Sequence, residues 1–193
     1  MYQKTRKIAV MAMLVALSVI MVAFIHFPIF PAATYLEYDP ADIPILIGAF
    51  AYGPLAGVIL TVVASLIQGF TVSVGSGLYG ILMHIIATST LVLVASGIYR
   101  IKHTRVGAVV GLICGTLAMC AIMMVANHFI TPLFTGLPVE VVDGMLLPII
   151  LPFNLLKAGI NSVITFLVYK VVSRYIIHGE VKGKQEVTWD SES

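Results

Sequence analysis

Long apolar runs, interrupted by short polar or proline-rich segments, set the pattern of this chain. The runs cover residues 8–27, 43–52, 55–70, 78–99, 106–130 and 145–177. A transmembrane helix needs about 20 mostly apolar residues, and no segment shows the alternation of a half-buried strand. The pattern therefore predicts an all-α integral membrane protein. We expect residues 1–177 to form one domain of six transmembrane helices, and 178–193 to form a polar cytoplasmic tail.

The segments between these runs are expected to be loops. The longest two are "FPIFPAATYLEYDPAD" at residues 27–42 and "TPLFTGLPVEVVDG" at 131–144, and "TVSVGSG" at 71–77 is shorter. The first of them is long, acidic and stiffened by proline. If a ligand binds on its side of the membrane, it is a candidate for a lid.

The overall composition agrees with this architecture. The chain is 60% hydrophobic and 10% charged, with a mean hydropathy of +1.04, whereas a soluble domain carries about 25% charged residues. The main solvent of the folded chain must therefore be the lipid bilayer. We expect a multi-pass membrane protein, with no nucleic-acid partner.

Charged residues then predict the orientation. Ten of the eleven Lys and Arg residues lie in three clusters, at residues 4–7, 100–105 and 170–184. With six spans, all three clusters fall on the same side, and positive charge marks the cytoplasmic side. Both termini are therefore expected in the cytoplasm, and the acidic segments at 37–42 and 140–143 outside.

The remaining cation, Lys157, lies deep inside the last apolar run. It shares one helical face with Asn154, Asn161 and Thr165, because residues three or four apart are neighbours on a helix. No acidic residue lies in any predicted span, so we expect a cation without an acidic partner. Such groups usually face a cavity, and the stripe predicts a pocket for a mostly apolar ligand.

Other polar residues recur at helical spacing inside the apolar runs. Asn127 and Thr131 share a face, and so do His84 and Thr88. A further stripe consists of Thr61, Ser65 and Gln68. These groups either line the same pocket or hydrogen-bond one another and hold the bundle together.

Small residues line two of the predicted helices. Ala9, Ala12 and Ala16 share one side of the first helix, and glycines repeat every four residues from Gly107 to Gly115. Small residues at this spacing allow another helix to approach closely. For the glycines we expect packing inside the bundle. For the alanines, internal packing and contact with a partner's helix both stay open.

The sequence lacks the motifs that would indicate several other functional classes. The chain has no GxxxxGK[ST] motif, so we expect no P-loop for ATP. Ser76 and His84 are too far apart along the chain to suggest a nucleophile and its base. Cys114 and Cys120 point about 240° apart on a helix, so we expect neither a disulfide nor a metal site.

Three segments resemble the substrate-binding S components of energy-coupling factor (ECF) transporters, and most closely those specific for riboflavin. They are "YLEYDPADIPILIGAFAYGPLAGVI", "GLYGILMHIIA" and "TPLFTGLPVEVVDGMLLPIILPFNLLKAGINSVITFLVYK". The most specific parts are the acidic motif at residues 39–44 and "PFNLLKAGIN" at 152–161. The resemblance covers roughly residues 7–175.

The resemblance implies the S-component fold, a location in the prokaryotic plasma membrane, and the capture of a vitamin from outside. It also implies a membrane-embedded T component and two cytoplasmic ATPases as partners. Ala12 and Ala16, with Ala9 beside them, match the motif through which S components contact the T component. The chain itself would be no enzyme, with riboflavin as bound substrate and no cofactor.

The resemblance further implies a set of ligand-binding residues. Lys157 and Asn154 match the pair that hydrogen-bonds the isoalloxazine ring, and Asn127 matches an asparagine of the same site. His84 departs from the family pattern, where asparagine is expected. The full expected set is Lys157, Asn154, Asn127, Asn161, Thr131, Leu36, Tyr38 and His84.

Other readings stay open on the sequence. Lys157 could equally meet the carboxylate of another vitamin, so an S component for thiamine or biotin is the alternative. A stand-alone channel or a membrane enzyme is a more distant one. Tyr35 and Phe153, like Leu36 and Tyr38, could cover a flat ligand or simply pack in the loop.

Overall fold

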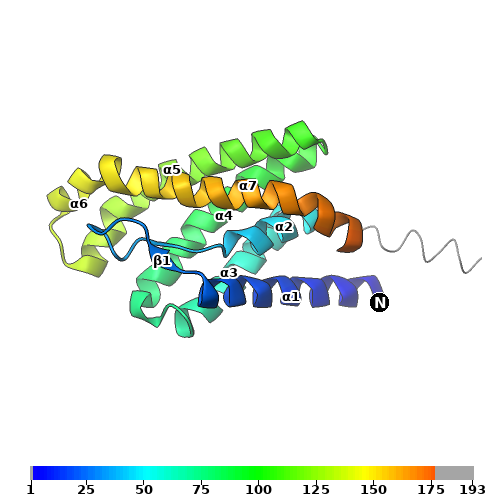
Figure 1. The fold of residues 1–193 in the computed structure, drawn as a ribbon, viewed down its shortest axis with the longest axis horizontal. Helices are drawn as coiled ribbons and strands as arrows, with labels where there is room; N and C mark the ends of the chain where they lie inside the picture. The colour runs from blue at the N-terminus through cyan, green and yellow to red at the C-terminus, as the bar shows by residue number, and fades with distance from the viewer. Residues whose placement is uncertain (1, 177–193) are drawn as a thin grey trace, which may run out of the picture.

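The computed structural model describes residues 2–176, and its architecture is helical (Figure 1). The helices are α1 Tyr2–Phe24, α2 Asp42–Tyr52, α3 Pro54–Phe70, α4 Gly77–Ile101, α5 Arg105–Thr135, α6 Val139–Met145 and α7 Leu151–Ile176. Short helical turns precede α4 and α7, at Val74–Ser76 and Leu146–Ile150. The tail predicted at residues 178–193 lies outside the described residues.

Four helical segments are long and apolar enough to cross a membrane. They are Lys4–Phe24, Val74–Ile101, Arg105–Thr135 and Val139–Tyr169. Helices α2 and α3 are apolar but shorter. Gly53 separates them, because its positive φ of 93° interrupts the helical backbone. Pro54 then begins α3, at a position where a backbone N–H would have no hydrogen-bond partner within the helix. The chain is a multi-pass membrane protein.

The prediction that the chain holds no strand is wrong. β1 (Phe27–Pro28) and β2 (Glu37–Tyr38) form a two-stranded antiparallel ribbon, which pairs Phe27 with Tyr38. The ribbon lies within the segment predicted as an irregular loop. A two-residue strand leaves no periodic pattern to read, and Pro28 limits its length because proline lacks an N–H for the ladder.

The predicted loop at residues 131–144 is also largely helical. Helix α5 continues past Pro132 to Thr135 and ends at Gly136, which has the left-handed φ of 72° common at helix ends. Helix α6 then follows almost at once. Polar composition suggested a loop here, but α5 continues through Pro132 at the cost of one backbone hydrogen bond.

The helices run back and forth along the long axis of the molecule (Figure 1). The N-terminus of α1, the turn between α4 and α5, and the end of α7 all lie at one end. Helix α6 and the turn between α3 and α4 lie towards the other end. Two of the three basic clusters, at residues 4–7 and 100–105, are therefore at the same end of the bundle.

Helices α4 and α5 approach each other closely at two glycines of α5. A Cβ atom added at Gly111 would lie 2.5 Å from the carbonyl oxygen of Ala95, and one at Gly115 would lie 2.8 Å from that of Leu91. These distances are too short for a side chain, so only glycine permits the approach. The expectation that these glycines pack inside the bundle is confirmed.

The alanines of α1 are arranged differently. Ala9, Ala12 and Ala16 are exposed, whereas α1 packs on the bundle through Val10, Leu14 and their neighbours. The alanine face therefore does not serve the internal packing of the described bundle.

Candidate functional site

A cavity lies between helices α3, α4, α5 and α7, and the segment that carries β2 contributes to its wall. Its volume is about 160 Å³, and its wall combines apolar side chains with a few polar groups, as small-molecule sites usually do. Its polar lining includes Asp39, His84, Asn127, Asn154 and Lys157. Its apolar lining includes Leu36, Met119, Met123, Phe134 and Phe153.

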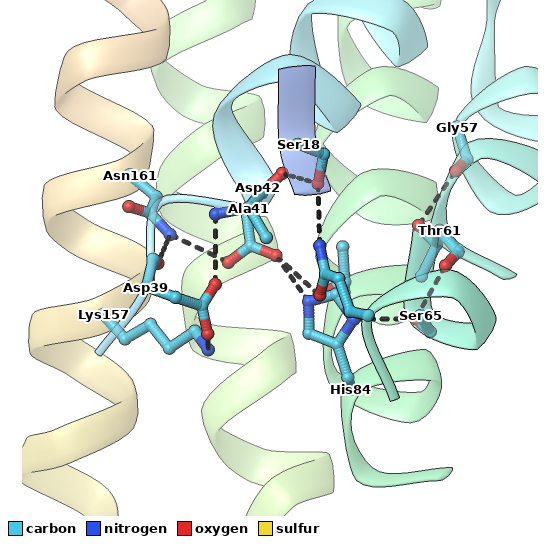
Figure 2. Close-up of polar contacts among 12 residues, drawn as sticks. Ser18, Asp39, Ala41, Asp42, Gly57, Thr61, Ser65, His84, Lys157 and Asn161 are labelled. Carbon is cyan, nitrogen blue, oxygen red and sulfur yellow. Dashed lines mark hydrogen bonds and ion pairs between the residues drawn. The ribbon is translucent and has the colours of Figure 1, made fainter. Parts of the chain in front are cut away.

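Lys157 lines this cavity and has an acidic partner. Its Nζ atom donates to Oδ2 of Asp39 at 2.6 Å, and both side chains are largely buried (Figure 2). The expectation of a cation without an acid is therefore wrong. Asp39 belongs to the segment between α1 and α2, which folds in against α7, so a search for acids within the spans could not find it.

Asn161 fixes the position of the acidic segment. Its Nδ2 atom donates to the backbone oxygen of Asp39 and to Oδ2 of Asp42, both at 3.0 Å. Its Oδ1 atom accepts from the Tyr38 hydroxyl at 3.1 Å. Asn161 and Tyr38 thus join the acidic segment to α7, and neither lines the cavity.

Asp42, at the start of α2, is completely buried. In addition to Asn161, its carboxylate accepts from Thr88 Oγ1 at 2.6 Å, and Nε2 of His84 lies 3.6 Å from Oδ1. A buried carboxylate is stable only when it is paired and hydrogen-bonded. The residues around Asp42 meet that requirement and connect α2 with α4 and α7.

His84 stands between this acid and helix α3 (Figure 2). The Ser65 hydroxyl donates to the backbone oxygen of Thr61 at 2.6 Å and lies 2.7 Å from Nδ1 of His84. The proton of the contact between Ser65 and His84 belongs to the hydroxyl or to Nδ1, depending on the tautomer of the histidine. The Nε2 atom is buried, makes no hydrogen bond, and belongs to a residue that lines the cavity.

Three amide and hydroxyl groups from α5 and α7 complete the polar lining. Asn127 donates to the backbone oxygen of Met123 at 2.7 Å and accepts from Thr131 at 2.8 Å. Asn154 donates to the backbone oxygen of Ile150 at 2.8 Å. Each amide nitrogen carries a second hydrogen, so both asparagines can still donate to a ligand.

Tyr35 adds an aromatic group with a polar end. Its ring packs at 71° to Phe134, with 6.3 Å between the ring centres. The hydroxyl is buried without a hydrogen-bond partner, and burial raises the pKa of Tyr35. It therefore stays a neutral O–H group that can bond to a ligand in the cavity.

The expected residues divide into two groups. Six line the cavity: Lys157, Asn154, Asn127, Thr131, Leu36 and His84. Tyr38 and Asn161 support the segment beside it instead. Asp39 and Asp42 were not predicted as site residues, although the spacing D-x-x-D before an apolar helix was an available signal. Among the described residues, no group of His, Cys, Asp or Glu side chains could hold a metal.

Comparisons with known proteins agree with this geometry. A family model described as the substrate-specific component of ECF transporters matches residues 6–169. The chain is similar to a solved structure described as the S component of a bacterial ECF transporter, with a TM-score of 0.78 and 29% identity. That match covers 90% of this chain and 99% of the other.

Two curated proteins show similarity over most of their length. The "Riboflavin transporter RibU" of Staphylococcus aureus (strain TCH60) is 29% identical over 185 residues, covering 90% of this chain and 94% of that protein. The "Riboflavin transporter FmnP" of Bacillus subtilis (strain 168) is 27% identical over 179 residues, covering 86% and 91%.

Proposed function

This chain belongs to the substrate-specific components of ECF transporters, and from that premise we propose that it binds riboflavin from outside the cell for uptake. The observation that carries the proposal is the cavity in which Lys157, Asn154 and Asn127 converge between apolar walls. Riboflavin transporters from two bacteria are similar to this chain over most of its length.

The chemistry of the cavity suits riboflavin. The vitamin is a flat ring system with carbonyl and imide groups along one edge and a polyol tail. An ammonium group has three hydrogens, so Lys157 can donate to a ring carbonyl and keep its bond to Asp39. The amides of Asn154 and Asn127 can both donate to and accept from the polar edge. Tyr35, Leu36 and Phe153 are placed to cover the ring faces.

The segment 25–41 would act as the lid. It contributes Tyr35, Leu36, Glu37 and Asp39 to the cavity wall, and the ion pair between Asp39 and Lys157 holds it against α7. In this proposal, the segment moves away to admit the ligand and then returns. Closing over the ligand would exclude water from the polar contacts and strengthen them.

The rest of the transport cycle would depend on partners. We place both termini in the cytoplasm across six spans, with α2 and α3 counted as short spans, because the basic clusters at residues 4–7 and 100–105 lie at one end (Figure 1). The T component would dock on the exposed face of Ala9, Ala12 and Ala16. Two cytoplasmic ATPases would supply the energy, and the chain itself would catalyse no reaction.

A titration of the purified full-length protein tests the proposal. Free riboflavin is fluorescent, and stacking against buried aromatic rings is expected to quench it on binding. We expect saturable quenching by the protein, with no competition from thiamine or biotin. Binding of thiamine or biotin without binding of riboflavin would contradict the proposal.

A further inference from the structure

Asp42 and His84 form a buried pair of titratable groups beside the cavity (Figure 2). The side chain of Asp42 is fully buried, and its hydrogen bonds come from Thr88 and Asn161, both of which are uncharged. A buried carboxylate needs a cation to balance it. Nε2 of His84 lies 3.6 Å from Oδ1 of Asp42, and it can supply that charge only if the imidazole ring is protonated.

The contacts of His84 distinguish its three possible protonation states. The Ser65 hydroxyl lies 2.6 Å from the backbone oxygen of Thr61 and 2.7 Å from Nδ1 of His84, and it has one proton to donate. With a proton on Nε2 alone, Nδ1 and the Thr61 oxygen would compete for that proton. With a proton on Nδ1 alone, the lone pair of Nε2 would face the carboxylate of Asp42. The doubly protonated ring satisfies all of these contacts, because Nδ1 then donates to Ser65, and Ser65 donates to Thr61.

The other charges around the pair leave the same requirement. Lys157 is bonded to Asp39 at 2.6 Å, so without a proton on His84 the two carboxylates of this region would share one ammonium. In the described part of the chain, α3 and α5 contribute no titratable side chain to the cavity wall. The remaining titratable groups of the wall are neutral or negative, and none of them can replace the cation. They are Tyr35, Glu37 and Tyr79.

The pair also stands at the end of the segment 25–41. Asn161 bonds both Oδ2 of Asp42 and the backbone oxygen of Asp39, so the carboxylate and the end of the segment are held in place together. Loss of the proton from His84 would leave Asp42 buried with uncharged donors and would weaken this attachment. By linkage, a proton that binds more tightly when Asp42 is in place also stabilises that arrangement.

We propose that His84 and Asp42 form a proton-binding site, in which the proton on His84 balances the buried carboxylate and secures the end of the segment 25–41. His84 is in this respect a positioning residue. The stabilisation is present at low pH and is lost as the pH rises through the titration of His84. The proton site is independent of the proposed function, because it holds whichever ligand the cavity takes.

Nuclear magnetic resonance of the full-length protein with 13C-labelled histidine tests the proton site directly. The ring signal that disappears in His84→Gln belongs to His84, and we expect it to show a doubly protonated ring at about pH 7. Asp42→Asn should weaken proton binding at His84 by at least about ten-fold, because a nearby opposite charge favours the charged form. A neutral ring at that pH in the unmodified protein would overturn the proposal, even if Asp42→Asn does not fold.

Hydrogen exchange tests the effect on the segment. The amide of Leu36 donates to the backbone oxygen of Ala33 at 2.9 Å, and the amide of Ala41 donates to Oδ1 of Asp39 at 3.0 Å. The protection of both amides, relative to free peptide, should fall when the pH is raised from about 6 to about 8, the range in which histidine titrates.

His84→Gln should give low protection at both pH values, because the uncharged side chain cannot balance Asp42. His103→Gln is the matched control, since His103 is an exposed histidine in the turn between α4 and α5. It should keep the pH dependence of the unmodified protein. Protection that is constant with pH in the unmodified protein, or that changes equally in His84→Gln, would show that the proton does not secure the segment.

Discussion

At the residue scale, the main feature is a cation whose counter-ion comes from outside its own helix. The apolar surroundings of Lys157 and its asparagine neighbours on one helical face predicted a buried polar site from the sequence. Asp39 was not foreseen as part of it, because nothing in the local pattern shows which way a proline-rich segment folds. Residue spacing can thus predict which polar side chains share a face of a helix. It cannot predict which loop residues pair with them, because that depends on the tertiary structure.

Lys157→Met tests the role of the ammonium. Riboflavin affinity should fall by at least about ten-fold, because a hydrogen bond to a charged group contributes about 1.5–3 kcal/mol. The melting temperature should also fall, because Asp39 would be left buried without a cation. Fluorescence titration and thermal unfolding measure the two effects.

The double variant Lys157→Met with Asp39→Asn separates binding from folding. It removes both charges, so the melting temperature should recover towards that of the unmodified protein while riboflavin binding stays weak. Unchanged affinity in Lys157→Met would show that the lysine does not contact the ligand.

Thr88→Val tests the support of the buried acid. The change removes the 2.6 Å hydrogen bond to Asp42 at nearly constant volume, and should lower the free energy of unfolding by about 1.5–3 kcal/mol. Thr90→Val is the matched control, because Thr90 donates only to the backbone oxygen of Ile86 on its own helix. Equal effects of the two changes on thermal unfolding would contradict a special role for Thr88.

At the element scale, helices were easier to foresee than the segments that join them. Apolar runs located every long helix, because burial in lipid requires continuous apolar sequence, but some helix ends differ from the prediction by up to six residues. The ribbon of β1 and β2 and the helix α6 were missed, since both are short and held by tertiary contacts. The glycines of α5 show the opposite case, where a simple four-residue spacing predicted a close helix contact.

Gly111→Ala tests that contact between α4 and α5. The new methyl group would meet the backbone of Ala95 at 2.5 Å, and relieving such an overlap costs about 1–3 kcal/mol. Gly97→Ala on α4 is the control, because a Cβ there meets nothing within 4 Å and alanine favours helix by up to about 1 kcal/mol. The melting temperature should fall only for Gly111→Ala, and equal behaviour would contradict the close packing.

At the scale of the whole molecule, the bundle leaves the alanine face of α1 exposed. It also encloses the polar cavity that Lys157 lines. The sequence predicted both features but could not tell whether the alanines of α1 packed internally. The structure decides this, since the bundle covers the opposite side of α1. What the sequence could not supply was the way the acidic segment closes over the cavity.

Ala12→Leu and Ala16→Leu test the exposed face. Each change should leave riboflavin binding by the isolated protein intact and abolish uptake by cells that express the complete transporter, because a larger side chain blocks close helix approach. Ala121→Leu is the control, since Ala121 is an exposed alanine on α5. Uptake retained in both α1 variants would place the partner contact elsewhere.

The ion pair between Asp39 and Lys157 has a consequence for the return of the protein after delivery. A carrier that binds its cargo through an ammonium must otherwise cross half of each cycle with a bare charge in a medium of low polarity. Here Asp39 balances the charge of Lys157 whether or not an uncharged ligand is bound. The empty protein therefore needs no ligand to neutralise its buried ammonium.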